Sequence, residues 1–182
     1  MSPGETLEVL LINDLDPAHS TNCADLNTEF CETSVTNLHT HGLHVSSKGI
    51  EDGLAAQSDN IFAVVEPGTT EHFAFTIPNN HMGGTFWYHP HHHHSTALQA
   101  GGGALGMIIV DDPPGYLPEP YDSMIEKVLV ISAHNLVTLQ AMARASQSTL
   151  FEDAETQADA LGLDTNIFLA NGQVGPILAF LS

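Results

Sequence analysis

Two histidine pairs stand out in the sequence, His39-Thr40-His41 and His89-Pro90-His91. On a β-strand, residues i and i+2 point to the same face, with their backbones roughly 7 Å apart. Each pair therefore directs two imidazoles toward one side of a strand. Because neutral imidazole is the most common side-chain metal ligand, this spacing indicates a metal site.

Placing the two pairs on neighbouring strands would bring four imidazoles together, since paired strands lie about 5 Å apart. Four such ligands exceed what a mononuclear site takes from one edge, so the pattern favours a polynuclear site. Nitrogen ligands alone suit copper, zinc, iron or nickel. The competing interpretation, ordinary histidines on strands, is preferred for a single pair but not for two matched pairs in one domain.

The residues around the pairs refine this prediction. Pro90 cannot donate a ladder hydrogen bond, so the second pair is expected where strand pairing stops. Gly42 permits close approach of the backbone. The tract His92–His94 extends the second pair and forms either an adventitious metal site or a solvated polar run, of which we favour the second. Surface or hydrogen-bonded side chains are expected for His19, His44, His72, His81 and His134.

Elements that could position these histidines are short strands between Thr6 and about Ile131. Phe73, Phe75 and Ile77 alternate as on one face of a half-buried strand. Several short apolar runs separated by turn signals favour an all-β Greek-key β-sandwich. Strands are expected over residues 7–12, 35–45, 61–65, 72–77, 84–91, 104–110 and 125–131.

The composition changes after Asn135. Residues 137–161 are rich in Ala, Gln, Glu and Met without Gly or Pro, which predicts a short helical or linker segment. An apolar strand signal returns at 167–170 and the chain stops in another apolar run, as a truncated domain would. We therefore predict a first domain over 1–135, a helical or linker insert over 136–165 and the start of a truncated second domain over 166–182.

The charge of the chain excludes some partners. Twenty-two acidic residues face three basic ones, for a formal net charge of -19, and this charge would repel nucleic acid and anionic membranes. No stretch is apolar enough to span a membrane, and the first residues do not resemble a signal peptide, so the sequence begins after any targeting segment or has none. Cys23 and Cys31 form a disulfide in an oxidising compartment or remain two free thiols.

The segments that carry the histidine pairs resemble a known family. Residues 36–45, TNLHTHGLHV, are similar to the first copper motif of multicopper oxidases, the family that contains the laccases. Residues 84–91, GTFWYHPH, resemble the second motif, and residues 169–173 look like the start of a second cupredoxin domain. The resemblance runs from about Thr6 to Pro176 and includes Asp59–Phe62, Pro67-Gly68, Gln99, Gly106 and Ile108–Val110.

The resemblance implies a cupredoxin-like fold and the first domain of a copper-dependent oxidase. His39 would bind the type 2 copper, and the type 3 pair would be bound by His41, His89 and His91. These residues would be half of the trinuclear cluster at which the family reduces dioxygen to water. Asp59, or Asp52 as second choice, would deliver protons, with a plain solvated carboxylate as the alternative. Phenols or metal ions would be oxidised elsewhere in the full protein, which the family places outside the cell or in the periplasm.

Departures from the family pattern limit this expectation. The family takes its other cluster histidines and the type 1 copper from its last cupredoxin domain, and the type 1 site needs a Cys flanked by histidines. Neither Cys23 nor Cys31 has such neighbours. The chain alone is therefore expected to be inactive, with the missing C-terminal cupredoxin domain as its partner. The alternatives are a free-standing copper-binding module and a structural cupredoxin unit with vestigial histidines.

Overall fold

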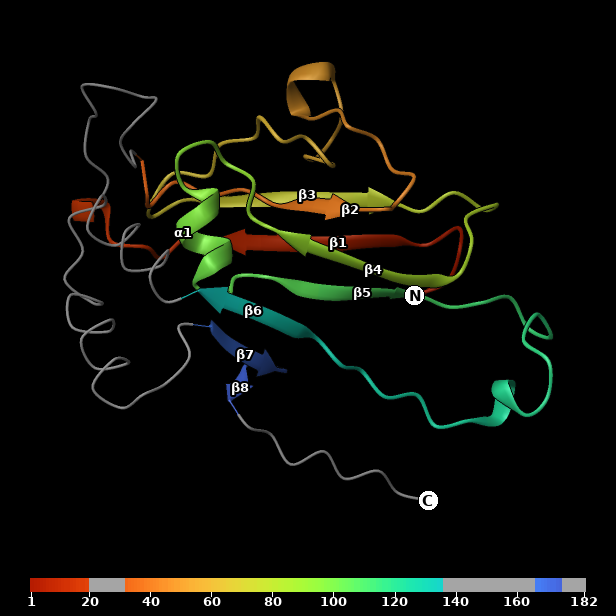
Figure 1. The fold of residues 1–182 in the computed structure, drawn as a ribbon. Helices are drawn as coiled ribbons and strands as arrows, with labels where there is room; N and C mark the ends of the chain where they lie inside the picture. Colours follow the sequence, from red (N-terminus) through yellow and green to blue (C-terminus); the bar gives the residue numbers. More distant parts are fainter. Residues whose placement is uncertain (20–31, 136–165, 175–182) are drawn as a thin grey trace. The chain divides into compact units, whose positions relative to one another are not determined.

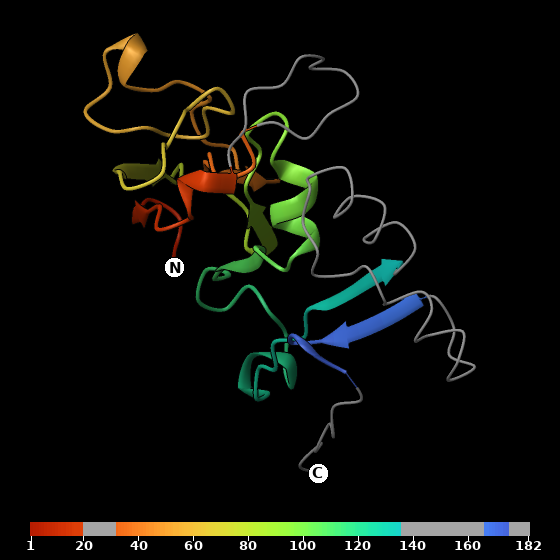
Figure 2. The same cartoon turned by 90° about the vertical axis from the view of Figure 1, so that its left-hand side faces the viewer.

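The computed structural model describes residues 1–19, 32–135 and 166–174, which form two compact units, Met1–Ile125 and Glu126–Ser182. Figure 1 shows the strands and the helix α1 of the described residues, and Figure 2 shows the same ribbon from the side. No helix in the described part of the chain has the length and apolarity needed to cross a membrane.

The first unit contains two antiparallel sheets (Figure 1). One sheet pairs β1 (Thr6–Ile12) with β3 (Thr70–Thr76), and the other has the order β2 (His39–His41), β4 (Gly84–His89), β5 (Gly106–Val110). The chain alternates between the sheets through its first four strands, as in Greek-key sandwiches. The remaining elements are α1 (Thr96–Gly101) and three 3₁₀ turns, Pro17–His19, Ile50–Asp52 and Tyr121–Ser123.

The hydrophobic core lies under β1 and β3 and extends to the residue before β2. Alternation along β3 buries Phe73 and Phe75 completely, and Ile77 follows the same parity, as the sequence predicts. Leu38, directly before β2, belongs to the same buried cluster, so the core reaches the segment that leads into the second sheet. The cluster is Leu38, Ala63, Val65, Phe73 and Phe75, with Leu7, Val9, Leu11 and Val45 packed against it.

The strand that carries the first histidine pair is shorter than predicted. Only His39–His41 of the expected strand 35–45 form β2. Thr36 makes an isolated bridge to Val65, which is also the only bridge that the expected strand 61–65 forms within the described residues. Gly42 has a φ of 85°, a left-handed conformation that ends the strand directly after the pair.

The second pair lies where the sequence predicts it, at the end of strand pairing. β4 ends at His89, and Pro90 and His91 lie beyond it. The ladder stops there because proline has no N–H to donate. The predicted strand 125–131 is wrong: residues 125–130 have no regular structure, and the strand β6 covers Ile131–Asn135. Ile125 is exposed, so no other element covers this apolar run at that position.

In the second unit, β6 (Ile131–Asn135) pairs with β7 (Asn166–Ala170), and β7 pairs with β8 (Gln173–Val174). Asn171 and Gly172 connect β7 and β8 with positive φ values of 49° and 75°, the two-residue hairpin turn expected from this dipeptide. β6 therefore shares a sheet with residues after the predicted insert, and the break between the units falls before residue 135. The predicted helical segment 136–165 and both cysteines lie outside the described residues, and the three predicted domains stay predictions.

Candidate metal centre

The register of β2 and β4 brings the two histidine pairs together. His39 lies directly opposite His89, and His41 lies opposite Trp87 in the antiparallel ladder. The ring centroids of His39 and His41 are 4.7 Å apart, and those of His41 and His89 are 5.0 Å apart. We call His39, His41 and His89 the histidine trio. One ring nitrogen of each lies within 4.8 Å of the others, a spacing that could hold a metal ion.

His91, the fourth predicted ligand, lies beside the histidine trio but outside the 4.8 Å set. Its ring centroid is 4.9 Å from that of His39 and 5.6 Å from that of His89. Its backbone N–H donates to Asn37 Oδ1 at 2.6 Å. Asn37 is buried, and its Nδ2 donates to the carbonyl oxygens of Ile61 and Ala63. Asn37 therefore fixes the backbone that carries His91.

Asp59 orients the first imidazole. Its Oδ1 accepts hydrogen bonds from His39 Nδ1 at 2.9 Å and from the backbone N–H of Thr40 at 2.7 Å. A carboxylate only accepts, so Nδ1 of His39 carries the proton and Nε2 is left as the ligand atom. A carboxylate or carbonyl on the far nitrogen is the usual partner of a metal-binding histidine.

His89 is held in the same way by a backbone carbonyl. Its Nδ1 donates to the Pro90 carbonyl oxygen at 2.7 Å, so neutral His89 has an unprotonated Nε2. This Nε2 lies 2.9 Å from Nε2 of His41, which must then be the donor between the two rings. Two of the three imidazoles thus present their Nε2 lone pairs, and metal binding would remove the proton from the third.

The surroundings of His41 and His89 favour the neutral imidazole, the form that binds metals. Burial lowers the pKa of His41, and repulsion from the neighbouring His39 and His89 rings lowers it further. Burial is also the main reason why the pKa of His89 is lowered. Trp87 stacks on His41 with ring centroids 4.0 Å apart, which restricts the ring of His41.

Asp52, His81 and His92, for which the sequence also led to predictions, lie outside the histidine trio. Asp52, the second choice for a proton donor, accepts from the backbone N–H of Gly49 in the 3₁₀ turn Ile50–Asp52. His81 is buried and hydrogen-bonded as expected, because its Nδ1 donates to the Met82 carbonyl oxygen and its Nε2 accepts from the His44 N–H. The preferred interpretation of the tract His92–His94 as a solvated run is wrong for His92, whose side chain is 2% exposed.

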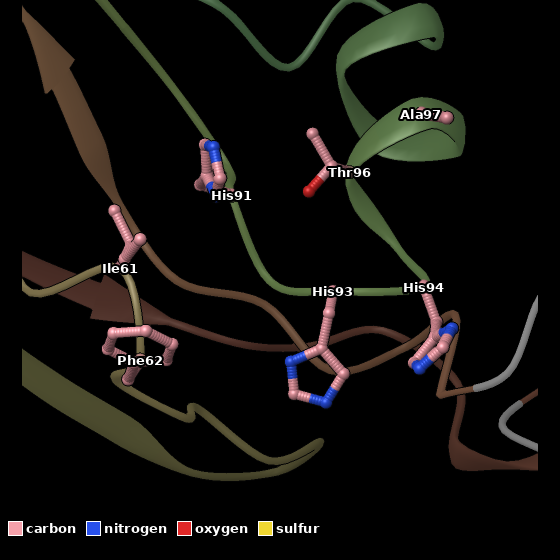
Figure 3. A pocket seen from close by; sticks show the side chains of 7 residues that line it. All are labelled: Ile61, Phe62, His91, His93, His94, Thr96 and Ala97. Atoms are coloured by element: carbon pink, nitrogen blue, oxygen red, sulfur yellow. The ribbon is translucent and has the colours of Figure 1, made fainter. Parts of the chain in front are cut away.

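Beside His91 lies an open pocket of about 420 Å³ (Figure 3). Ile61 and Phe62 lie on one side of it, and Thr96 and Ala97 from the start of α1 lie on the other (Figure 3). The side chains of His93 and His94 complete the lining. The pocket therefore connects solvent with His91, which lies at the edge of the histidine trio.

Among the described residues, Asn37 and Trp87 take part in this site without having been predicted to do so. Asn37 precedes the first pair by two residues and stands among polar and apolar neighbours, so the local sequence gives no signal of its role. Its role depends on the contact with His91, which is far away in the sequence. Spacing within a strand cannot reveal such a contact.

The family model for multicopper oxidases matches residues 26–115, which contain both histidine pairs and Asp59. The chain belongs to the multicopper oxidase family, and its antiparallel strands form an all-β, cupredoxin-like fold. No protein in the search of curated sequences matches the chain.

Several solved structures are similar to part of the chain. A multi-copper oxidase from Pediococcus acidilactici is 25% identical with a TM-score of 0.43, over 62% of this chain and 18% of that one. The laccase-like multi-copper oxidase CueO from Ochrobactrum sp. is 26% identical with a TM-score of 0.41, over 62% of this chain and 19% of that one. The chain thus matches less than a fifth of the length of these two proteins.

Proposed function

We propose that this chain is the first cupredoxin domain of a laccase-like multicopper oxidase and supplies half of its trinuclear copper site. In this proposal His39 binds the type 2 copper, and the type 3 pair is bound by His41, His89 and His91. The observation that carries the proposal is the convergence of three imidazole nitrogens within 4.8 Å, on a chain that belongs to this family. An all-nitrogen donor set suits copper.

The residues of the site prepare it for the metal. Hydrogen bonds to Asp59 and to the Pro90 carbonyl leave Nε2 of His39 and of His89 facing the shared space. The stacked Trp87 holds His41 beside them. Such fixed ligands lose little conformational entropy on binding. Bound copper would supply electrons to dioxygen, the oxidant of this family.

Asp59 has two roles in this proposal. As a positioning residue it holds His39 and the Thr40 backbone through Oδ1. As the predicted proton donor it would use Oδ2. The open pocket beside His91 would give water a route to the ring that lies next to His39, the residue that Asp59 holds.

The full reaction needs parts that this chain does not contain. The family's type 1 copper and the remaining cluster ligands come from a last cupredoxin domain, and phenols or metal ions would be oxidised there. We propose that this domain is the partner, that the whole enzyme is secreted or periplasmic, and that the isolated chain does not turn over.

The first test is the size of the native protein in an immunoblot with an antibody against this chain. Three cupredoxin domains of about 150 residues each should give a band near 50 kDa or above. A band near the chain's own 19.4 kDa would contradict the oxidase proposal and favour a free-standing copper-binding module.

The second test is copper binding by the chain itself. Removing a residue that hydrogen-bonds to a metal ligand typically lowers the metal affinity 10–100-fold. Removing a ligand itself, as in His41→Ala, should therefore lower the copper affinity at least about 100-fold. The matched control is His72→Ala on β3, an exposed histidine outside the site. Equal copper affinity of both variants, measured by chelator competition, would contradict the assignment of the ligands.

A further inference from the structure

A second group of metal-binding side chains lies outside the histidine trio. Glu32, which precedes the segment leading into β2, meets His92 and His93, which follow β4. One ligand atom of each lies within 4.8 Å of the others. We call these three residues the loop cluster. The proposed oxidase function uses none of them.

The distances within the loop cluster do not fit hydrogen bonds. Oε2 of Glu32 lies 4.0 Å from Nε2 of His92 and 3.7 Å from Nε2 of His93. Both separations exceed the limit of about 3.2 Å for an N–H···O bond. Ligands of a tetrahedral zinc ion with bonds of 2.0–2.1 Å lie about 3.4 Å apart, so small side-chain movements would complete such a geometry.

His92 adds an independent observation. Its side chain is 2% exposed, and its Nδ1 has no hydrogen-bond partner among the described residues. Burying a polar atom without a partner costs free energy, so a buried imidazole normally has partners on both nitrogens. An ion held between His92 and Glu32 would bind Nε2, the ring nitrogen that lies 4.0 Å from Glu32 Oε2. This bond would offset part of the cost of burying the ring, while Nδ1 would still have no partner.

The helix α1 holds both backbone segments of the loop cluster in place. The His92 carbonyl oxygen accepts from the backbone N–H groups and the hydroxyls of Ser95 and Thr96. On the other side, Gln99 Nε2 donates to the carbonyl oxygens of Thr33 and Val35. Thr33 directly follows Glu32, so one short helix positions ligands from two distant parts of the sequence.

We propose that Glu32, His92 and His93 bind a divalent transition-metal ion such as Zn²⁺ at a site separate from the histidine trio. Two imidazoles and one carboxylate form a common ligand set for zinc. His93 is 63% exposed and also lines the pocket beside His91, so water fills the remaining coordination positions (Figure 3). The ion joins the segment that enters β2 to the segment that leaves β4, the two strands that carry the histidine pairs.

The test is a Zn²⁺ titration of the full chain with a coloured competing chelator, in a His41→Ala background that weakens the histidine trio. Addition of Glu32→Gln or His93→Gln should each weaken Zn²⁺ binding at least tenfold. Both residues are at least half exposed, so neither substitution removes a core contact, and circular dichroism verifies the fold. The matched control is His94→Asn, since asparagine tolerates the positive φ of 70° at this neighbouring position.

The proposal is supported if the background and the control bind Zn²⁺ equally while the two loop-cluster variants bind it weakly. It is overturned if all four proteins bind Zn²⁺ with the same affinity, or if the His41→Ala background binds none. Copper binding by the histidine trio is measured separately, in Glu32→Gln with His41 present. Failure of the oxidase proposal would therefore leave the Zn²⁺ result unchanged.

Discussion

In the histidine trio and in the loop cluster the ligand atoms lie within 4.8 Å of one another, but the two clusters are supported differently. In the histidine trio, three rings project from two paired strands, and two of them have their far nitrogens hydrogen-bonded to Asp59 and Pro90. In the loop cluster, only His92 is buried, while Glu32 is 50% and His93 63% exposed. Ligand distances alone therefore do not distinguish a preorganised site from one that must still order its side chains.

The difference has an energetic consequence. Immobilising an exposed, rotamer-rich side chain costs about 0.5–1.5 kcal/mol, which the loop cluster would lose on binding for Glu32 and His93. The ligands of the histidine trio are already oriented before a metal arrives. We therefore expect the histidine trio to bind copper more tightly than the loop cluster does.

Asn37→Leu should have the largest effect, because Asn37 connects the two sites. Its side chain makes three hydrogen bonds, to the Ile61 and Ala63 carbonyl oxygens and to the N–H of His91, which precedes the loop cluster. Losing three buried bonds at about 1 kcal/mol each should reduce the free energy of unfolding by about 3 kcal/mol. Urea denaturation measures this change.

The control for Asn37→Leu is Asn80→Leu at an exposed position, which should change stability by at most about 0.5 kcal/mol. Metal binding by Asn37→Leu should weaken at both sites, because the His91 backbone, which lies beside the histidine trio and directly precedes the loop cluster, would no longer be fixed. Weakening confined to one site would show that the two sites do not depend on a shared support.

Asp59→Asn should have an intermediate effect, confined to the histidine trio. Asparagine keeps an oxygen that accepts from Thr40 and His39 but removes the negative charge that makes His39 a stronger ligand. The affinity for copper should fall about 10-fold, which is the lower end of the range observed when a hydrogen-bond partner of a metal ligand is changed. Asp52→Asn, the matched control in the nearby 3₁₀ turn, should leave copper affinity unchanged. Equal losses in both variants would indicate a general effect of charge on this acidic chain.

The histidine trio could be predicted because its chemistry is local in the sequence. The i, i+2 spacing places His39 and His41 on one face wherever a strand forms, and Pro90 marks the end of the partner strand. The face of Phe73 and Phe75 followed from alternation for the same reason. The matched spacing of the two histidine pairs suggested that both pairs serve one site. If they do, the strands that carry them, β2 and β4, must lie side by side.

The loop cluster could not be predicted, since it depends on contacts between distant segments. Nothing near Glu32 in the sequence indicates that Gln99 holds its backbone neighbours beside His92. The burial of His92 within a run of four histidines also has no local signal. The wrong strand at 125–131 has a related cause, because an apolar run predicts a strand only if a partner strand covers it, and Ile125 and Val128 are exposed.

Substitution of Trp87 is expected to have the smallest effect on metal binding. The fluorescence of Trp87 also distinguishes metal binding at the histidine trio from metal binding at the loop cluster. It is the only tryptophan of the chain, its ring stacks on His41 and its centroid is 4.9 Å from that of His89. Copper in the histidine trio should quench its fluorescence, since quenching by this ion acts at contact distance, whereas Zn²⁺ in the loop cluster should leave the emission nearly unchanged. Trp87→Phe keeps an aromatic ring and should weaken copper binding by only about threefold, within the 0.5–1.5 kcal/mol of an aromatic contact. Unquenched emission at saturating copper would show that the metal binds away from His41.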